Sequence, residues 1–531
     1  MDTMQQYLRV RAGEDTVGLR FGDRAWTWRE YVAGAAARAN AVRSLMSGDR
    51  PPHVGVLLEN TPEMAFALSA GALAGHVTAG INRTRRGEGL ARDVATADCQ
   101  VLLTDGRHLP LLEGLDLPGV CVVDTDGPEW AELVEAHAGE VRDPRAVGTM
   151  DTFMLIFTSG TSGAPKAVQV SNFMVVMSGS MLADRFSVTA DDVCYLSMPL
   201  FHSNAVVAGY AVAVCSGATM ALAPRFSASG FLDDVRRYGA TYMNYVGKPL
   251  AYILQTQRLA DDADNPLRVA FGNEASDKDI AEFAERFGTI VWDGFGSTEN
   301  AVIVTRVPET PPGSIGMPWD GVAVYDRATR TECPRARFDE TGRVVNLDDC
   351  VGELVNTTGA GFFSGYYNDK QATDERLDGG MYWSGDLAYR DEAGFVYFAG
   401  RTSDWLRVDG ENLAAGVVEQ VLLRHPAVNR VAVYGVPDPH SGDQLVAALV
   451  LNDGAELDPA AFERFLADQP DLPAVARPRH VRVATDLPST ATNKVLKREL
   501  VRQGLEFDDP HWERDERGTA YRVRAAQGGA A

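Results

Sequence analysis

The sequence predicts an α/β protein in which a large N-terminal region of parallel sheets is followed by a β-rich subdomain and a small α+β unit. The chain has 531 residues, 45% of them hydrophobic, and can therefore bury several cores. Segments typical of strands, such as 53–58 and 100–104, alternate with Ala-rich helical segments such as 63–74. This alternation is typical of parallel sheets covered by helices.

A smaller β-rich subdomain is expected after these sheets. Between residues 313 and 398, short β-like runs such as 352–356 and 394–398 are separated by Gly and Asp turns.

A compact α+β unit is expected at the C-terminal end, because the sequence pattern changes again after Arg401. Its elements are expected at residues 417–424, 428–434, 444–451, 459–467 and 480–483. We place the boundary near residues 400–404, so that residues 1–401 form the N-terminal domain and residues 402–531 the C-terminal domain. The tail after Phe507 is charged and then rich in Gly and Ala, so its end is expected to be disordered.

Charge and cysteine content exclude several classes of protein. The 50 Lys and Arg against 73 Asp and Glu give a net charge of -23, which disfavours binding to nucleic acid or anionic membranes. The six cysteines lie far apart with no Cys-x-x-Cys pair, so reduced and mostly buried thiols are expected rather than disulfides or a zinc site.

No secretory signal is visible at the start of the chain, because a basic stretch followed by an apolar core is missing, and we expect a cytoplasmic protein. The uncharged stretch 205–224 approaches the length of a membrane helix. It contains Gly, Ser and Thr, so it is expected to form a buried helix and a core strand rather than a membrane span.

The most informative segment covers residues 154–166, where an apolar strand leads into a loop of Gly, Ser and Thr that ends at Lys166. Such a loop offers backbone N–H groups, hydroxyls and a cation to a polyphosphate. It is not a Walker A loop, because Pro165 takes the place of the second glycine and Ala167 follows the lysine. A P-loop kinase or ATPase is thereby disfavoured, and a Gly/Ser surface turn is the alternative if the segment is taken alone.

Together with five further motifs, this segment resembles the adenylate-forming superfamily of acyl-CoA synthetases, luciferases and nonribosomal peptide adenylation domains. The five motifs are Pro-Leu-Phe-His-Ser-Asn at 199–204, Gly-Phe-Gly-Ser-Thr-Glu at 294–299, Trp-Ser-Gly-Asp-Leu at 383–387, Gly-Arg at 400–401 and Leu-Pro-Ser-Thr-Ala-Thr-Asn-Lys at 487–494. The resemblance spans almost the whole chain in the same order. It implies a fold with a large N-terminal domain and a small mobile C-terminal domain.

The resemblance implies a nucleotide site with ATP and magnesium as ligands. The residues that it assigns to the phosphates are Thr158, Ser159, Gly160, Thr161, Ser162, Gly163 and Lys166. Those around the adenine, the α-phosphate and the acyl group are Gly272, Asn273, Glu274, Gly294, Phe295, Gly296, Ser297 and Thr298. Phe295 matches the aromatic residue that stacks on adenine, and Glu299 the carboxylate that holds magnesium, which prefers oxygen ligands.

Asp386 matches the acceptor for both ribose hydroxyls, with Arg401 as a nearby donor. His202 matches the gate beside the acyl pocket, although a histidine in an apolar setting can also be a packed core residue.

Lys494 matches the catalytic lysine of adenylation. As the carboxylate attacks the α-phosphorus, negative charge builds on the phosphoryl oxygens, and a positioned ammonium stabilises it. In the family the C-terminal domain then rotates about a hinge, here Ser403, and presents a second loop, here residues 407–412. Gly410 in that loop has no Cβ and would let the thiol of coenzyme A approach closely.

Two departures from the family pattern concern the ATP half-reaction. Ala167 replaces the usual Gly after the loop lysine, where a methyl group could crowd the phosphates or strain a left-handed backbone. Asn493 replaces the usual Gly before the catalytic lysine. The alternative hypothesis is therefore an enzyme that adenylates poorly and mainly joins a preformed acyl-adenylate to coenzyme A, with a separate enzyme as adenylating partner.

The acid is expected to have no α-amino group, because His202 stands where amino-acid adenylating domains usually carry Asp. It is also expected to be hydrophobic. The motif at 199–205 resembles the fatty and very-long-chain acyl-CoA synthetase branch, and small residues such as Ala208 and Gly209 leave space for a bulky acid. Fatty, aromatic and terpenoid acids all remain candidate substrates. Luciferase chemistry and a homodimer also remain as alternatives. A non-catalytic binding module is disfavoured because the charged motif residues are present, and a serine hydrolase because no Gly-x-Ser-x-Gly elbow is found.

Overall fold

The computed structural model describes residues 1–524 apart from residues 143, 159–164, 341, 343, 402–404, 409–410, 439–441, 471, 490–494 and 516–517. The chain divides into two compact units. The first contains residues 1–301 and 360–379, and the second contains residues 302–359 and 380–531. The predicted boundary at residues 400–404 falls largely on residues 402–404, outside the described residues, and stays a prediction.

One sheet of the first unit carries the strand that leads toward the predicted phosphate loop. Its strands lie in the order β6 (Cys121–Asp124), β5 (Val101–Thr104), β3 (His53–Leu57), β4 (Val77–Gly80), β7 (Thr152–Thr158) and β8 (Lys166–Ser171). All neighbours are parallel except β7 and β8, which are antiparallel. Helices α2 (Trp28–Ser44), α3 (Pro62–Ala74), α4 (Gly87–Thr96) and α5 (Pro128–Ala136) belong to the same part of the chain.

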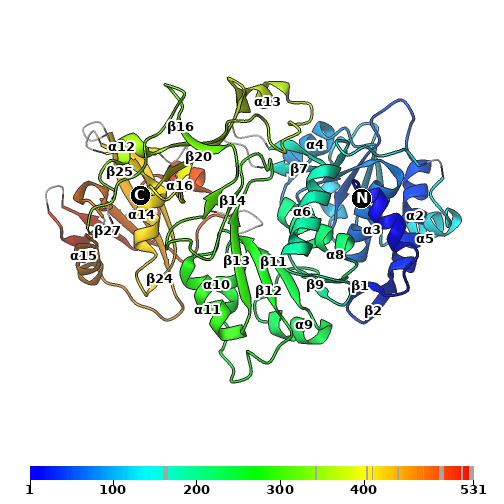
Figure 1. The fold of residues 1–531 in the computed structure, drawn as a ribbon, viewed down its shortest axis with the longest axis horizontal. Helices are drawn as coiled ribbons and strands as arrows, with labels where there is room; N and C mark the ends of the chain where they lie inside the picture. Colours follow the sequence, from blue (N-terminus) through cyan, green and yellow to red (C-terminus); the bar gives the residue numbers. More distant parts are fainter. Residues whose placement is uncertain are drawn as a thin grey trace. The chain divides into compact units, whose positions relative to one another are not determined.

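The second sheet of this unit is also mainly parallel. Its strands within the unit lie in the order β13 (Ile290–Phe295), β12 (Val269–Asn273), β11 (Tyr242–Val246), β9 (Val193–Leu196), β10 (Thr219–Leu222), β1 (Val17–Phe21) and β2 (Arg24–Thr27). Helices α9 (Phe231–Tyr238), α10 (Pro249–Leu254) and α11 (Asp277–Phe287) lie beside these strands (Figure 1). They share one apolar core with the strands, in which Phe231 and Phe283 pack with Tyr245. Further helices of the unit are α1 (Met4–Arg11), α6 (Asn172–Arg185) and α13 (Lys370–Arg376).

The uncharged stretch 205–224 forms a buried helix and a core strand, as predicted. The helix runs through α7 (Ser203–Ala205), the π-helical turn η2 (Val206–Tyr210) and α8 (Ala211–Ser216), and the strand is β10. No helix among the described residues combines the length and apolar character that crossing a bilayer requires.

Apart from residues 360–379, which belong to the first unit, the second unit contains the predicted β-rich segment and the predicted α+β segments. Its first sheet has the antiparallel order β17 (Thr331–Glu332), β16 (Val322–Asp326), β18 (Gly352–Asn356) and β20 (Met381–Arg390), and β21 (Val396–Arg401) pairs with β20. Shorter elements are β14 (Val304–Thr305), β15 (Met317–Pro318) and α12 (Leu347–Cys350). The expected strand at 352–356 is confirmed to the residue.

The other sheet of the second unit lies entirely after residue 404. Its order is β23 (Glu411–Ala414), β22 (Trp405–Val408), β25 (Gly442–Leu451), β26 (His480–Val483), β27 (His511–Arg514) and β28 (Tyr521–Val523), with β24 (Val428–Asp438) paired to β25. Helices α14 (Ala415–Leu422), α15 (Pro459–Ala467) and α16 (Lys497–Gln503) complete it. The charged part of the C-terminal tail supplies β27 and β28, whereas the Gly/Ala-rich end lies outside the described residues. All six cysteines are free, and four of them are buried.

Arg286 stabilises the first unit from inside α11. Its guanidinium pairs with Asp262 at 2.6 Å, and the two side chains are 4% and 3% exposed. The same guanidinium donates to the carbonyls of residues 253, 254, 256 and 257, where the chain leaves α10. The pair therefore ties α11 to a loop that has little regular structure of its own.

Arg286→Met is expected to lower the free energy of unfolding by about 3–5 kcal/mol, because it leaves the buried Asp262 carboxylate without its partner. Urea unfolding of the intact chain measures the effect. Arg258→Met is the matched control, since Arg258 and Glu285 form a pair whose side chains are 62% and 77% exposed, and its loss should cost no more than about 1 kcal/mol. Equal destabilisation by both substitutions would contradict this account.

Candidate active site

The predicted nucleotide residues of the first unit lie where its parallel strands end. Gly272 and Asn273 close β12, and they are in register with Asp293 and Gly294 of the neighbouring β13. The carboxyl ends of adjacent parallel strands form the usual ligand-binding edge of an open α/β sheet. The structure therefore brings the segments 272–274 and 294–299 side by side, while their roles in binding stay predictions.

The backbone leaves β12 in an unusual conformation. Glu274 has a φ of 68°, in the left-handed region that residues with a Cβ rarely adopt. Such conformations persist where surrounding structure enforces them, and they cluster at functional sites. At Gly272, an added Cβ would lie 2.3 Å from the carbonyl oxygen of Tyr245, so glycine is required for β11 and β12 to approach.

Three asparagine side chains connect the elements around this edge. The Asn244 amide donates to Asn204 at 2.7 Å, Asn204 donates to Asn273 at 3.1 Å, and Asn273 donates to the Gly294 carbonyl at 2.7 Å. The Ser203 and Thr298 hydroxyls lie 3.1 Å apart. Asn244 was not predicted as a site residue, because no local motif links it to residues on α7 and β12.

His202 lies directly before α7, beside Phe201, with ring centroids 4.3 Å apart. Its Nε2 is buried and has no hydrogen-bond partner among the described residues. Burial, and after it the positive charge of Arg83, lower the pKa of His202 to about 4. The imidazole is therefore neutral at physiological pH, which is compatible with the predicted gate and with a packed core histidine.

Glu299 follows β13 and is 9% exposed. Its Oε1 accepts a hydrogen bond of 2.8 Å from the Tyr366 hydroxyl. Lys166 begins β8, and its Nζ lies 5.1 Å from the centroid of the Tyr366 ring. The predicted phosphate-binding lysine and the predicted magnesium carboxylate thus share one neighbour, Tyr366, which no sequence motif indicated.

These groups fit a magnesium nucleotide. Among the described residues, no cluster of three or more His, Cys, Asp or Glu side chains could hold a metal ion by itself. Magnesium is commonly held by one or two carboxylates together with the phosphates of a nucleotide. A single buried carboxylate whose tyrosine neighbour also contacts a lysine suits that arrangement. Bound there, the ion would neutralise phosphate charge during adenylation.

The structure does not support the hypothesis that the Ala167 methyl group crowds the phosphates or strains a left-handed backbone. Ala167 is not in a loop: it belongs to β8, is paired with Phe157, and does not have a left-handed φ. Its side chain is 1% exposed and packs in the apolar core with Leu57 and Leu155. The methyl group therefore contacts the core rather than the predicted phosphate site.

Ala167→Gly is accordingly expected to leave adenylation unchanged within about twofold and to lower the free energy of unfolding by about 0.5–1 kcal/mol, because glycine in a strand loses more backbone entropy on folding. Acid-dependent pyrophosphate release and urea unfolding measure the two quantities. A several-fold gain in adenylation would show that the methyl group does obstruct ATP.

Asp386 and Arg401 belong to the second unit. They lie opposite each other on β20 and β21, with Arg401 Nε 3.5 Å from Asp386 Oδ1. Asp386 is 6% exposed. The pair is compatible with the predicted ribose acceptor and its neighbouring donor.

Several predicted residues lie outside the described residues. They are Ser159, Gly160, Thr161, Ser162 and Gly163 of the phosphate loop, the hinge residue Ser403, Gly410, Asn493 and Lys494. Their roles stay predictions from the motifs.

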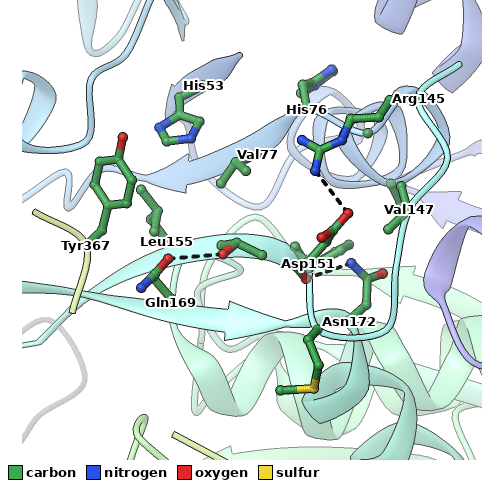
Figure 2. Close-up of a pocket in the computed structure, with 16 residues that line it drawn as sticks. His53, His76, Val77, Arg145, Val147, Asp151, Leu155, Gln169, Asn172 and Tyr367 are labelled. Atoms are coloured by element: carbon green, nitrogen blue, oxygen red, sulfur yellow. Dashed lines mark hydrogen bonds and ion pairs between the residues drawn. The ribbon is translucent and has the colours of Figure 1, made fainter. Parts of the chain in front are cut away.

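A cavity of about 270 Å³ lies where strands β3, β4 and β7 of the first sheet begin (Figure 2). It is lined by His53, Val77 and Thr152, which begin β3, β4 and β7, and by Tyr367. Lys166, by contrast, pairs with Thr158 at the far end of β7. None of the residues predicted to bind substrate lines this cavity, so it is not part of the candidate active site.

The family of the chain follows from comparison with known proteins. Residues 8–367 match the AMP-binding enzyme family, and residues 417–494 match the AMP-binding enzyme C-terminal domain. The chain belongs to this family of AMP-binding enzymes.

Similar proteins indicate which class of AMP-binding enzyme the chain belongs to. A medium/long-chain-fatty-acid–CoA ligase of Mycobacterium tuberculosis, FadD17, is 51% identical over 96% of this chain and 98% of its own length. A steroid-22-oyl-CoA synthetase of Rhodococcus jostii is 48% identical over 96% of this chain and 92% of its own. The solved o-succinylbenzoate CoA synthetase of Bacillus subtilis, in complex with its acyl-adenylate, is 26% identical with a TM-score of 0.77 and covers 93% of this chain and 97% of its own.

This protein is an AMP-forming acyl-CoA ligase. The Bacillus subtilis o-succinylbenzoate CoA synthetase has also been solved with ATP and a magnesium ion bound. The predicted fold class and superfamily are confirmed.

Proposed function

We propose that this enzyme activates a bulky hydrophobic carboxylic acid and carries out both half-reactions itself. The observation that carries the proposal is near full-length similarity to two ligases whose names specify lipid acids, one medium- or long-chain fatty and one steroidal. The neutral His202, where an Asp would hold an α-ammonium group, supports an acid without an amino group.

The first half-reaction forms the acyl-adenylate. A carboxylate oxygen attacks the α-phosphorus of ATP, the bond to the β-phosphate oxygen breaks, and pyrophosphate leaves. Lys166 would hold the phosphates and Thr298 the α-phosphate, because ammonium and hydroxyl groups suit phosphate oxygens. Lys494 would stabilise the negative charge that builds on the α-phosphoryl oxygens.

The second half-reaction forms the thioester. The sulfur of coenzyme A attacks the acyl carbonyl carbon, the bond to the phosphate oxygen breaks, and AMP leaves while the thiol loses its proton. We propose that the C-terminal domain rotates about Ser403 between the two steps and that Gly410 then lets the thiol approach. Because these steps use different loops, each can be measured and impaired separately.

The alternative, an enzyme specialised for the second step, has lost part of its support. It rested on Ala167 and Asn493, and Ala167 packs in the core of β8. Asn493 tolerates a left-handed backbone better than most residues. A separate adenylating partner is needed only under this alternative.

The test is an assay with two arms. One arm supplies ATP, magnesium and dodecanoate, a steroid with a side-chain carboxyl group, benzoate or phenylalanine, and measures pyrophosphate release. The other supplies synthetic acyl-adenylates with coenzyme A and measures thioester formation. Pyrophosphate release with dodecanoate or the steroid acid, and much less with benzoate and phenylalanine, is the expected result. Preference for benzoate would overturn the substrate proposal, and activity in the second arm alone would establish the alternative.

A further inference from the structure

Residues 365–367 run alongside β8, the strand that begins at Lys166. The Gln169 N–H donates to the Gly365 carbonyl at 3.0 Å, and the Tyr367 N–H donates to the Ala167 carbonyl at 2.8 Å. Val168 and Tyr366 form an antiparallel bridge. This segment, which is far from β8 in sequence, is therefore fixed to the strand that carries the predicted phosphate-binding lysine.

The two tyrosines of this segment contact different groups. The Tyr366 hydroxyl reaches Glu299, whereas Tyr367 donates to Asp98 at 3.0 Å and stacks edge-on against His53 at 4.9 Å. Figure 2 shows Tyr367 beside His53 at the cavity. Two adjacent tyrosines thus make the same kind of hydrogen bond to a carboxylate, one in the candidate active site and one outside it.

Tyr366 is held firmly at the site. Its side chain is 4% exposed, and Phe363 packs against it with ring centroids 5.0 Å apart. Burial, together with the charge of Glu299, raises the pKa of its hydroxyl, so the group remains protonated and donates to the carboxylate. Lys166 Nζ lies 5.1 Å from the centroid of the Tyr366 ring, within the range of a cation–π contact.

We propose that Tyr366 is a positioning residue of the adenylation half-reaction, which sets the Glu299 carboxylate for the magnesium ion and guides Lys166 toward the phosphates. The inference rests on the proposed function, since it takes Glu299 as the magnesium carboxylate and Lys166 as the phosphate-binding lysine. The hydroxyl holds Oε1 of Glu299, while Oε2 accepts no hydrogen bond from another described residue. One oxygen is thereby fixed and the other is left for the metal.

The contacts of Tyr366 with Glu299 and with Lys166 predict separable effects. Tyr366→Phe removes the hydrogen bond to Glu299 but keeps the ring near Lys166. In the absence of the carboxylic acid substrate, this variant should need about tenfold more magnesium to reach half of its maximal affinity for ATP. The effect is this large because hydrogen bonds to charged groups are among the stronger ones. Tyr366→Leu also removes the ring, and it should further weaken ATP binding at saturating magnesium about threefold.

Titration calorimetry of ATP into the enzyme at a series of magnesium concentrations measures these quantities without turnover. Tyr367→Phe is the matched control: it loses a hydrogen bond of the same type at the next residue, and its magnesium dependence should equal that of the wild type. Thioester formation from a synthetic acyl-adenylate and coenzyme A should stay within twofold in all variants, which shows that each is folded.

An unchanged magnesium dependence in Tyr366→Phe, or an equal shift in Tyr367→Phe, would overturn the role of Tyr366. Loss of thioester formation in parallel with ATP binding would also overturn it, because a merely structural role predicts that both steps fail together. A wild-type enzyme that forms no acyl-adenylate and binds no ATP would overturn the proposed function and this inference with it. The wild-type assays thus distinguish the two failures.

Discussion

Glu299→Gln is expected to slow acid-dependent pyrophosphate release by about 10²- to 10³-fold, while thioester formation from a synthetic acyl-adenylate changes little. Glutamine keeps the shape of the side chain, and its amide oxygen can still accept the hydrogen bond that Tyr366 makes at 2.8 Å. What is lost is the negative charge that magnesium, a hard cation, requires from its ligand. Losses of this size are typical when a group that stabilises transition-state charge is removed.

The measurement is pyrophosphate release at several magnesium concentrations, and excess magnesium should recover part of the lost rate. Glu285→Gln is a suitable control, because Glu285 lies on α11 with its side chain 77% exposed. If Glu299→Gln kept more than half of the wild-type rate at limiting magnesium, Glu299 would not be the metal carboxylate.

Lys494→Ala is expected to have an equally large effect, again on the first half-reaction alone. The lysine ammonium would stabilise both the approach of the carboxylate and the charge on the phosphoryl oxygens, so adenylation should fall about 10²- to 10³-fold. Thioester formation should be retained, because in the proposed cycle the lysine loop has left the site when coenzyme A reacts. Both rates come from the two-arm assay.

The control for Lys494→Ala is Lys497→Ala, three residues further along the chain. Lys497 begins α16 and pairs with Glu419 at 2.8 Å, so it is engaged within its own unit and should not be needed for adenylation. If both variants lost adenylation equally, or if Lys494→Ala lost both half-reactions, the assignment of Lys494 would be wrong.

Much of the fold could be predicted from the hydrophobic pattern. The apolar run at 53–58 is β3, the Ala-rich segment at 63–74 is α3, and the run at 352–356 is β18. These elements follow from local composition, because a buried strand or helix needs a continuous or periodic apolar surface. The order of strands in the sheets could not be predicted, since it depends on contacts between distant segments.

Ala167 shows how a motif can mislead. Taken as part of a loop, it suggested a crowded or strained phosphate site. The structure reverses that interpretation, because Ala167 is paired with Phe157 on two antiparallel strands and its methyl group is buried in the core. The sequence shows which residue is present but not which side of the strand it occupies.

The candidate site was predictable in its motifs and not in its connections. Lys166 and Glu299 stand in recognisable segments, whereas Tyr366 lies 67 positions from Glu299 and becomes relevant only through a hydrogen bond. Asn244 is similar, since its link to Asn204 depends on how α7 packs near β11. Such contacts are properties of the folded chain, and no local pattern indicates them.

The most direct test of the central claim is the two-arm assay on the unmodified enzyme with dodecanoate and the steroid acid. If this chain is a complete ligase for hydrophobic acids, at least one of them will release pyrophosphate from ATP, and its synthetic adenylate will yield the thioester with coenzyme A. Thioester formation without any pyrophosphate release would contradict the account and would show that adenylation is carried out by another enzyme.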